Sequence, residues 1–292
     1  MLPRSRGAAG LCLDPRTAQR ALPAVWLNLL CLDAPVVAIT WLWLFSHTFG
    51  LPLSSGNAAA LFLTAWLIYL ADRLADVFAL EPGAPRSLRH DFCLRHQRIW
   101  RWAVGVIAGL DAWIVWRHLE DGIFLAGACL GALALIYLLL NHSLGQVWRS
   151  VPLKEVSIGF LFAAGTLVPL LPRLAFTFVL AALLFAFLCV LNCIAIACWE
   201  RGLDAGQGKV SVATRFPALC HWVRTTAFGL AVASSVAAIA LPAAAPVLGC
   251  IALSAALLGL LDARRELFGN DTRTALADLV LLSPIAVLLL KL

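Results

Sequence analysis

Long apolar runs, interrupted by clusters of charge, proline or glycine, dominate the chain. We predict nine helical segments from these runs, at residues 22–49, 57–79, 99–117, 122–141, 153–171, 174–199, 221–241, 244–262 and 273–290. Each run is close to or above the length of about 20 residues that crosses a membrane. None alternates apolar and polar residues as a transmembrane β-strand does, so the expected fold is an all-α, polytopic membrane bundle.

The composition agrees with this pattern and excludes other classes of protein. Hydrophobic residues make up 62% of the chain and charged residues 13%, and the mean hydropathy is +0.91. These values exclude a water-soluble globule, a disordered protein and a disulfide scaffold. Residues 1–21 carry four arginines and no apolar run, so we interpret them as a cytoplasmic tail before a single membrane domain at 22–292. The nine scattered cysteines are expected to be reduced, small hydrophobic residues.

The distribution of lysine and arginine predicts the orientation in the membrane. The N-terminal tail and the loops after the second, fourth, sixth and eighth segments hold 19 of the 22 basic residues, and the other side holds Arg117, Arg173 and Lys291. Because basic loops stay in the cytoplasm, the N-terminus is expected there and the C-terminus on the opposite side. The same bias accounts for most of the net charge of +6, so no nucleic-acid partner is expected.

Two similar acidic motifs recur at matched positions near predicted helix ends. The second segment ends in Asp72-Arg73-Leu74-Ala75-Asp76, and the sixth is followed by Glu200-Arg201-Gly202-Leu203-Asp204. Both read acid-Arg-x-x-Asp, and each acid lies 128 residues from its counterpart. Four segments separate the motifs. The repeat predicts two related four-helix halves plus one helix.

The spacing of these acids indicates a chemistry. Residues i and i+4 share one helix face, so two facing pairs would form a cup of four carboxylates at the membrane boundary (Asp72, Asp76, Glu200 and Asp204). Clustered carboxylates need cations, and hard oxygen ligands suit Mg²⁺, which also binds substrate phosphates. Arg73 and Arg201 would add donors to a phosphate. Asn192 lies two turns before Glu200 and is expected either to complete the cup as a neutral ligand or to bridge two helices.

With these motifs the chain resembles the UbiA family of intramembrane prenyltransferases, whose nine helices carry acidic motifs at the cytoplasmic ends of helices 2 and 6. The resemblance lies in the Ala71–Asp76 stretch, in Glu200–Asp204 followed by Gly208-Lys209-Val210-Ser211, and in Leu32-Asp33-Ala34-Pro35. It implies Mg²⁺-dependent transfer of a prenyl group from a prenyl diphosphate to a lipophilic acceptor within the membrane, in many members an aromatic ring. It further implies catalytic and metal-binding roles for the four acids, and substrate-binding roles for Lys209, Tyr137, Asp33 and Lys154.

Several positions depart from the family pattern. Ile68 and Tyr69 stand where the first motif has Asn and Asp, Cys31 replaces an arginine, and Asn141 replaces a lysine for which His142 or Lys154 could substitute. These departures leave an alternative, a catalytically degenerate UbiA-like membrane protein with a binding or assembly role. A transporter is disfavoured, because transporters place polar groups near the midplane, whereas the acids here concentrate at one face.

Other polar residues in or near apolar segments are expected to be functional or paired, because an acid there is costly. Asp33 is the best further site candidate, because Pro35 would break the helix locally. Glu155 is interpreted as a membrane-edge charge, and Asp111 and Asp278 as hydrogen-bond partners between helices. The basic loop at 80–101 is expected either to clamp a diphosphate or to contact anionic membrane lipid.

Overall fold

The computed structural model describes residues 23–81, 83–143, 154–170 and 175–290, and every regular element in these ranges is helical. The predicted tail at 1–21 lies outside the described residues, as do Arg173 and Lys291. The α-helices are α2 (Pro23–Leu29), α3 (Asp33–Phe49), α4 (Ser55–Phe78), α5 (Leu88–Arg95), α6 (Gln97–His118), α7 (Asp121–Ser143), α9 (Lys154–Leu167), α10 (Phe176–Gly206), α11 (Val212–Arg215), α12 (Val223–Ala240), α13 (Ala245–Ala263), α14 (Asn270–Leu279) and α15 (Pro284–Leu290). Short 3₁₀ helices are η1 (Val168–Leu170), η2 (Pro217–His221), η3 (Pro242–Ala244), η4 (Arg265–Leu267) and η5 (Val280–Leu282).

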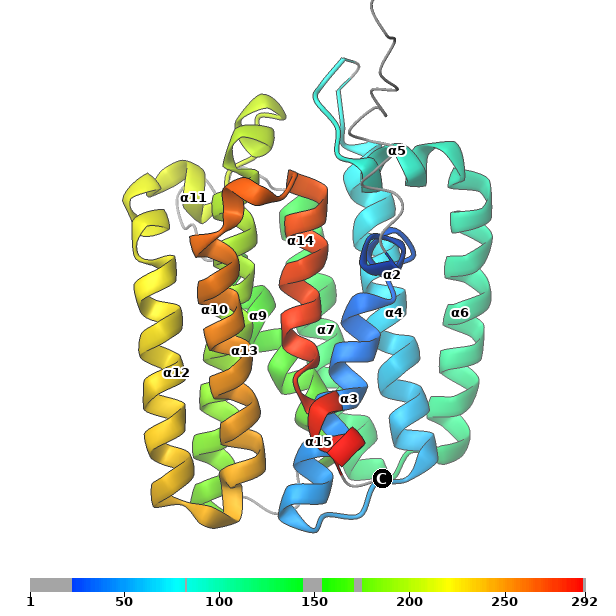
Figure 1. Cartoon of the computed structure of the whole chain (residues 1–292). Helices are drawn as coiled ribbons and strands as arrows, with labels where there is room; N and C mark the ends of the chain where they lie inside the picture. Colours follow the sequence, from blue (N-terminus) through cyan, green and yellow to red (C-terminus); the bar gives the residue numbers. More distant parts are fainter. Residues whose placement is uncertain (1–22, 82, 144–153, 171–174, 291–292) are drawn as a thin grey trace, which may run out of the picture.

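The long helices stand side by side in one bundle, with α5 and α11 at one end (Figure 1). Six of them are long and apolar enough to cross a membrane, at Ser55–Phe78, Gln97–His118, Asp121–Leu140, Phe176–Gly206, Val223–Ala240 and Pro242–Ala263. A seventh span results if Asn270–Leu282 and Pro284–Leu290, which are bent by 46°, cross together. The all-helical fold is thus confirmed, and its long apolar helices are compatible with a multi-pass membrane protein. The count of nine crossings and the two four-helix halves stay predictions.

Two of the nine predicted segments are broken near their ends by local backbone features. In the first segment, Cys31 adopts a left-handed conformation with φ 55°, which ends α2 and lets α3 begin at Asp33. Pro35 is tolerated in the first turn of α3 because its missing N–H would have no helical partner there. In the last segment, the bend occurs before Pro284.

Helix α10 lies in the main hydrophobic core. Trp41 of α3 stacks on Phe185 of α10 with ring centroids 4.5 Å apart, and its indole N–H donates to the Leu281 carbonyl at 2.7 Å. A Cβ atom at Gly159 of α9 would lie 2.5 Å from the Val190 backbone nitrogen, so α9 and α10 approach closely only because this residue is glycine. The core therefore brings together α3, α9, α10 and the segment around Leu281.

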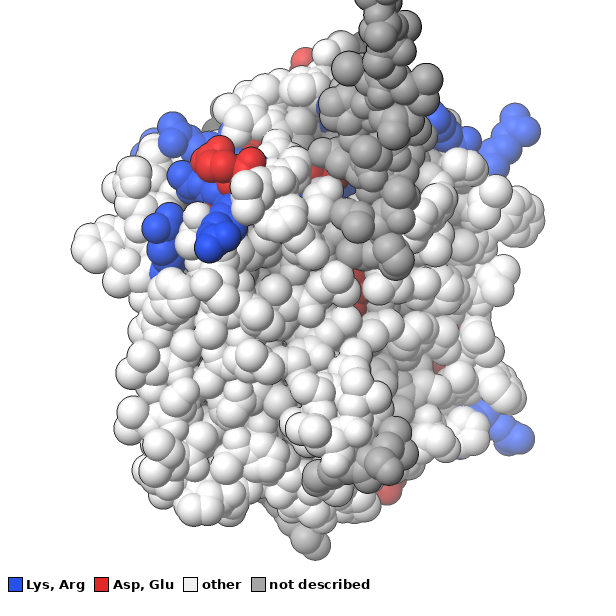
Figure 2. Space-filling model, viewed as in Figure 1, with Lys and Arg blue, Asp and Glu red and all other residues white. Residues whose placement is uncertain are grey.

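Charge is concentrated at one end of the bundle. Figure 2 shows most of the visible lysines and arginines at the end that carries α5 and α11. The side of the bundle that faces the viewer in Figure 2 is largely uncharged below this end, which is compatible with a surface that contacts lipid. This arrangement agrees with the bias found in the sequence, while the side of the membrane on which this end lies stays a prediction.

Candidate functional site

Both acidic motifs lie on continuous helix, as their spacing predicted. Helix α4 extends to Phe78, so Asp72 and Asp76 are one turn apart on it. Helix α10 extends to Gly206, past the predicted end at 199, and contains Glu200 and Asp204. With 31 residues α10 is about 46 Å long, whereas the hydrocarbon core of a bilayer is about 30 Å thick. Its acidic end can therefore reach the aqueous boundary.

An ion pair joins the two motifs. The Lys209 ammonium lies 3.0 Å from the Asp76 carboxylate, and the Lys209 amide donates to the Asp204 carbonyl at 2.9 Å. Gln207 also donates through its side chain to the Pro85 carbonyl at 2.8 Å. The ends of α4 and α10 are thus held together at one end of the bundle.

Glu200 is held by residues from two other helices. Its carboxylate accepts from the Arg89 guanidinium of α5 at 2.5 Å and from the Thr274 hydroxyl of α14 at 3.0 Å. Burial disfavours the charge on Arg89, but Glu200, Asp76 and Asp271 together outweigh this effect and raise the pKa of Arg89 above its ordinary value. The second motif thus contains one partner of a largely buried ion pair.

His90 approaches the first motif from α5. Its Nε2 lies 3.8 Å from Asp76 Oδ2, and its Nδ1 is 3.0 Å from the Ser87 hydroxyl oxygen. Burial lowers the pKa of His90 below its ordinary value, against the opposing effect of Asp76. Burial and the neighbouring basic side chains thus disfavour a positive charge on this imidazole.

Other predicted site residues gather at the same end. Lys154, the first residue of α9, lies close enough to act electrostatically on both Asp76 and Asp204. The Tyr137 hydroxyl on α7 is similarly close to Asp72 and Asp76. The structure therefore brings both acid pairs, Lys154, Lys209 and Tyr137 into one region.

Four further predicted site residues differ in their burial and in their partners. Asp33 and Asn192 are buried. Asp33 accepts from Asn28 at 2.6 Å. Asn192 donates to Asp278 at 3.3 Å, which favours its interpretation as a bridge between helices. Arg73 is half-buried, and its Nη1 has no hydrogen-bond partner among the described residues. Arg201 is exposed.

The structure shows the hydrogen-bond partners of two acids inside the predicted apolar segments, Asp111 and Glu155. The Thr64 hydroxyl of α4 donates to Asp111 of α6 at 2.8 Å, so Asp111 links two helices as predicted. Glu155, the second residue of α9, is 5% exposed and accepts from the Val212 amide of α11 at 3.2 Å, so it is buried and hydrogen-bonded. Its location at the membrane edge stays a prediction.

The expectation that all cysteines are reduced is wrong for one pair. Cys198 of α10 and Cys220 of η2 form a disulfide. The 22-residue separation matches no recognisable sequence motif, and the pair meets only because the chain after α10 turns back. The bridge lies two residues from Glu200. Sequence reasoning also missed Thr274, whose position 74 residues from Glu200 gave no signal.

The carboxylates supply the hard oxygen atoms that Mg²⁺ prefers, but they are not assembled as a closed metal site. Within the described residues, no group of three or more His, Cys, Asp or Glu side chains is placed to hold a metal ion. Asp76 and Glu200 are instead paired with Lys209 and Arg89. The donor chemistry therefore fits Mg²⁺, and the geometry requires these two basic side chains to move when a metal binds.

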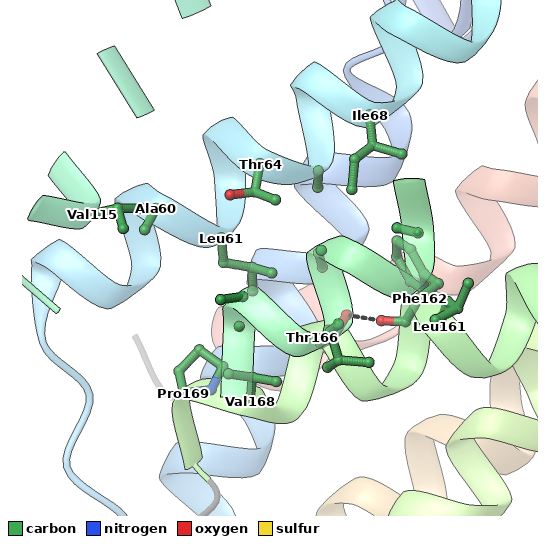
Figure 3. A pocket seen from close by; sticks show the side chains of 18 of the residues that line it. Ala60, Leu61, Thr64, Ile68, Val115, Leu161, Phe162, Thr166, Val168 and Pro169 are labelled. Atoms are coloured by element: carbon green, nitrogen blue, oxygen red, sulfur yellow. Dashed lines mark hydrogen bonds between the residues drawn. The ribbon is translucent and has the colours of Figure 1, made fainter. Parts of the chain in front are cut away.

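An apolar cavity lies beside this site, among α4, α6, α7 and α9. Its volume is about 330 Å³, within the range of small-molecule pockets. Tyr69 and Tyr137 line the part nearest the acids, and the cavity continues to Val168 and Pro169. Figure 3 shows side chains of α4 and α9 on two sides of it (Leu61, Thr64 and Ile68; Leu161, Phe162 and Thr166).

No family model, no curated protein and no solved structure matches the chain.

Proposed function

We propose that this chain is an intramembrane prenyltransferase that uses Mg²⁺ to transfer a prenyl group from a prenyl diphosphate to a lipophilic acceptor, as its resemblance to the UbiA family implies. The observation that carries the proposal is the 3.0 Å ion pair between Asp76 and Lys209. This ion pair connects the ends of the two helices whose acidic motifs lie 128 residues apart in the sequence. An apolar cavity, lined in part by Tyr69 and Tyr137, lies beside it.

The carboxylate pairs would hold the metal, and the basic residues would hold the diphosphate. Asp72 and Asp76 on α4 and Glu200 and Asp204 on α10 present oxygen atoms from two helices. In this proposal two basic groups, the Lys209 ammonium and the Arg89 guanidinium, leave their carboxylate partners and donate to phosphate oxygens. Each basic group thereby exchanges a carboxylate for a phosphate as its anionic partner. Bound Mg²⁺ would act as a Lewis acid on the departing pyrophosphate.

Further basic residues surround this position. Lys154 is placed to act on the same acids, and the half-buried Arg73 has an unpartnered Nη1 that can donate to an anion. Together with Lys209 and Arg89 they supply the positive charge that a diphosphate requires. This role also fits the basic loop at 80–101, which contributes Arg89.

The cavity would hold the prenyl chain. Its lining is almost entirely apolar and begins at Tyr69, one turn before Asp72 on α4. A prenyl diphosphate with its phosphates among the basic residues could place its chain directly in this space. The apolar lining would also exclude water from the allylic cation that forms when pyrophosphate departs.

The finer membrane arrangement belongs to the same proposal. Nine crossings result if α2 with α3, α9 with η1, and α14 with α15 each cross as broken helices, in addition to the six long spans. Helix α15 lies at the end opposite α5 and α11 (Figure 1), which is consistent with termini on opposite sides. The lysine and arginine bias assigns the end with α5 and α11 to the cytoplasm.

One observation favours the degenerate, non-catalytic alternative. Asp76 and Glu200 already have basic protein partners, so these two acids do not need a metal for neutralisation. Lipid extracts from cells with and without the gene distinguish the alternatives when compared by mass spectrometry. We expect a prenylated compound to be missing when the gene is deleted. Identical prenylated lipids in the two extracts would favour a binding or assembly role.

A further inference from the structure

A second, smaller chamber lies in the interior of the bundle, away from the carboxylates that would hold Mg²⁺. Its volume is about 30 Å³, which is enough for one small polar group. Side chains from α4, α9, α10 and α14 line it, and its polar members are Tyr69, Asn192 and Asp278. Asp278 links this chamber to Asp33 through a shared hydrogen-bond partner.

That partner is Asn28, whose side-chain amide donates to Asp33 at 2.6 Å and to Asp278 at 3.5 Å. The Asn192 amide nitrogen donates to the other oxygen of Asp278 at 3.3 Å. Both amide N–H groups are therefore directed at carboxylate oxygens. Apart from the Tyr69 hydroxyl, the polar groups that the chamber still offers are hydrogen-bond acceptors.

The side-chain oxygen of Asn192 is the acceptor that lacks a partner. Asn192 is only 4% exposed, and its Oδ1 makes no hydrogen bond among the described residues. A buried, unsatisfied carbonyl oxygen is unfavourable, and it is satisfied by a donor that enters the chamber. The chamber is thus suited to a hydroxyl group.

The chamber and the larger apolar cavity share part of their lining. Tyr69, Ile158 and Phe162 line both. The two spaces therefore adjoin at these side chains, and a largely apolar molecule in the larger cavity would reach towards Asn192 between them. Apolar pockets with few convergent polar groups are typical of sites that orient a lipophilic ligand.

We infer that this chamber binds the hydroxyl group of a lipophilic phenol or alcohol, with Asn192 Oδ1 as the acceptor and Asp278 beside it. Binding of the hydroxyl group does not depend on the proposed function. Only the identification of the bound molecule as the prenyl acceptor rests on it. Asn192 lies two turns before Glu200, about 12 Å along α10. The hydroxyl group would be anchored at that distance and would orient the rest of the acceptor towards the diphosphate.

A pair of matched probes tests the inference without prenyl transfer. Binding of 4-hexylphenol and of its methyl ether, 4-hexylanisole, is measured as Kd on the purified full-length protein in detergent. The two probes share their apolar part, and only the phenol can donate to Asn192. We expect the phenol to bind about 10- to 100-fold more tightly, as one buried hydrogen bond to an otherwise unsatisfied acceptor provides. Equal affinities in the wild-type protein overturn the inference.

Substitutions then locate the effect. Asn192→Leu removes the acceptor, and we expect the phenol to bind it no better than the ether. The control Ser234→Ala alters a buried polar residue on α12, which lines neither space, and should keep the full preference. A preference that persists in Asn192→Leu also overturns the inference, and the wild-type comparison decides the question even if this variant does not fold.

The outcome is distinguishable from failure of the proposed function. A preference for the phenol without any Mg²⁺-dependent prenyl transfer retains the hydroxyl site and rejects the transferase. Prenyl transfer without the preference retains the transferase and rejects the hydroxyl site.

Discussion

Replacing Glu200 with Gln should destabilise the protein because it removes the nearest counterion of the Arg89 guanidinium. The change keeps the shape of the side chain and an oxygen that can accept from Thr274, but it removes the negative charge 2.5 Å from the Arg89 guanidinium. The side chains of Arg89 and Glu200 are 18% and 9% exposed. Arg89 donates to Glu200 through Nη2, and its Nε has no hydrogen-bond partner among the described residues. Arg89 would therefore remain largely buried and positively charged.

The expected magnitude follows from that burial. Removing one partner of a fully buried pair costs about 3–5 kcal/mol, and the partial exposure of Arg89 reduces this to about 2–4 kcal/mol. For a chain of this size the loss corresponds to a fall in Tm of about 5–10 °C. The assay is thermal unfolding of the purified protein in detergent, followed by intrinsic tryptophan fluorescence.

Two further variants show whether the charge itself is responsible. Arg201→Gln changes the next residue of α10, which is exposed, and should alter the stability by less than about 0.5 kcal/mol. Adding Arg89→Met to Glu200→Gln should restore at least half of the lost stability, because neither charge then remains unpaired. An unchanged Tm in Glu200→Gln would refute the reasoning, and so would a double variant that is less stable than the single one.

Three other predictions follow from the packing and the disulfide. Gly131→Leu should leave Tm unchanged, because a Cβ atom there meets nothing within 4 Å. It should shorten the prenyl chain that the protein transfers, because Gly131 lines the cavity. Unchanged chain-length selectivity, measured by mass spectrometry of the products, would argue against this use of the cavity. Gly159→Ala should destabilise the protein by about 2 kcal/mol or more, because its Cβ would lie 2.5 Å from the Val190 backbone; a wild-type Tm would show that α9 and α10 can separate without cost. Dithiothreitol should lower the Tm of the wild-type protein, because loss of the disulfide costs up to about 3 kcal/mol of stability. It should not affect a variant with serine at both Cys198 and Cys220. Equal responses of the two proteins would indicate that the disulfide does not form.

The sequence predicted the helices well and their interruptions poorly. Apolar runs identify membrane helices because the bilayer requires continuous apolar length, and all nine predicted segments contain helix. The break at Cys31 depends on one residue with positive φ, which no periodicity reveals. The length of α9 was overestimated for a related reason, since its apolar run continues into η1 after the α-helix has ended.

The site was predictable where chemistry and spacing coincide on one helix. Asp72 with Asp76 and Glu200 with Asp204 fall one turn apart because an i, i+4 spacing is a local property. The partners were less predictable, because they depend on how distant helices pack. Arg89 was expected only as part of a basic loop, and Thr274 lies on a helix for which the sequence suggested no role in the site.

Buried polar residues show the same limit. Asp278 was expected to bridge helices, and it does, but its partners Asn28 and Asn192 are 250 and 86 residues away. The sequence left two roles open for Asn192, a neutral metal ligand or a hydrogen-bond bridge between helices. Which of them applies depends on which helix packs against it. Only the three-dimensional arrangement also reveals that one of its polar atoms is left unsatisfied.

The most direct test of the central claim is prenyl transfer by the purified protein. Labelled prenyl diphosphate is incubated with the detergent-solubilised protein and a lipid extract as acceptor, with Mg²⁺ or with EDTA. We expect Mg²⁺-dependent label in a lipid product, lowered by about 100-fold or more in Asp72→Ala and in Asp204→Ala. The matched control Asp121→Ala changes an exposed acid at the start of α7 and should retain wild-type activity. Wild-type rates in both Asp72→Ala and Asp204→Ala, or no Mg²⁺-dependent transfer by the folded wild-type protein, would contradict the account.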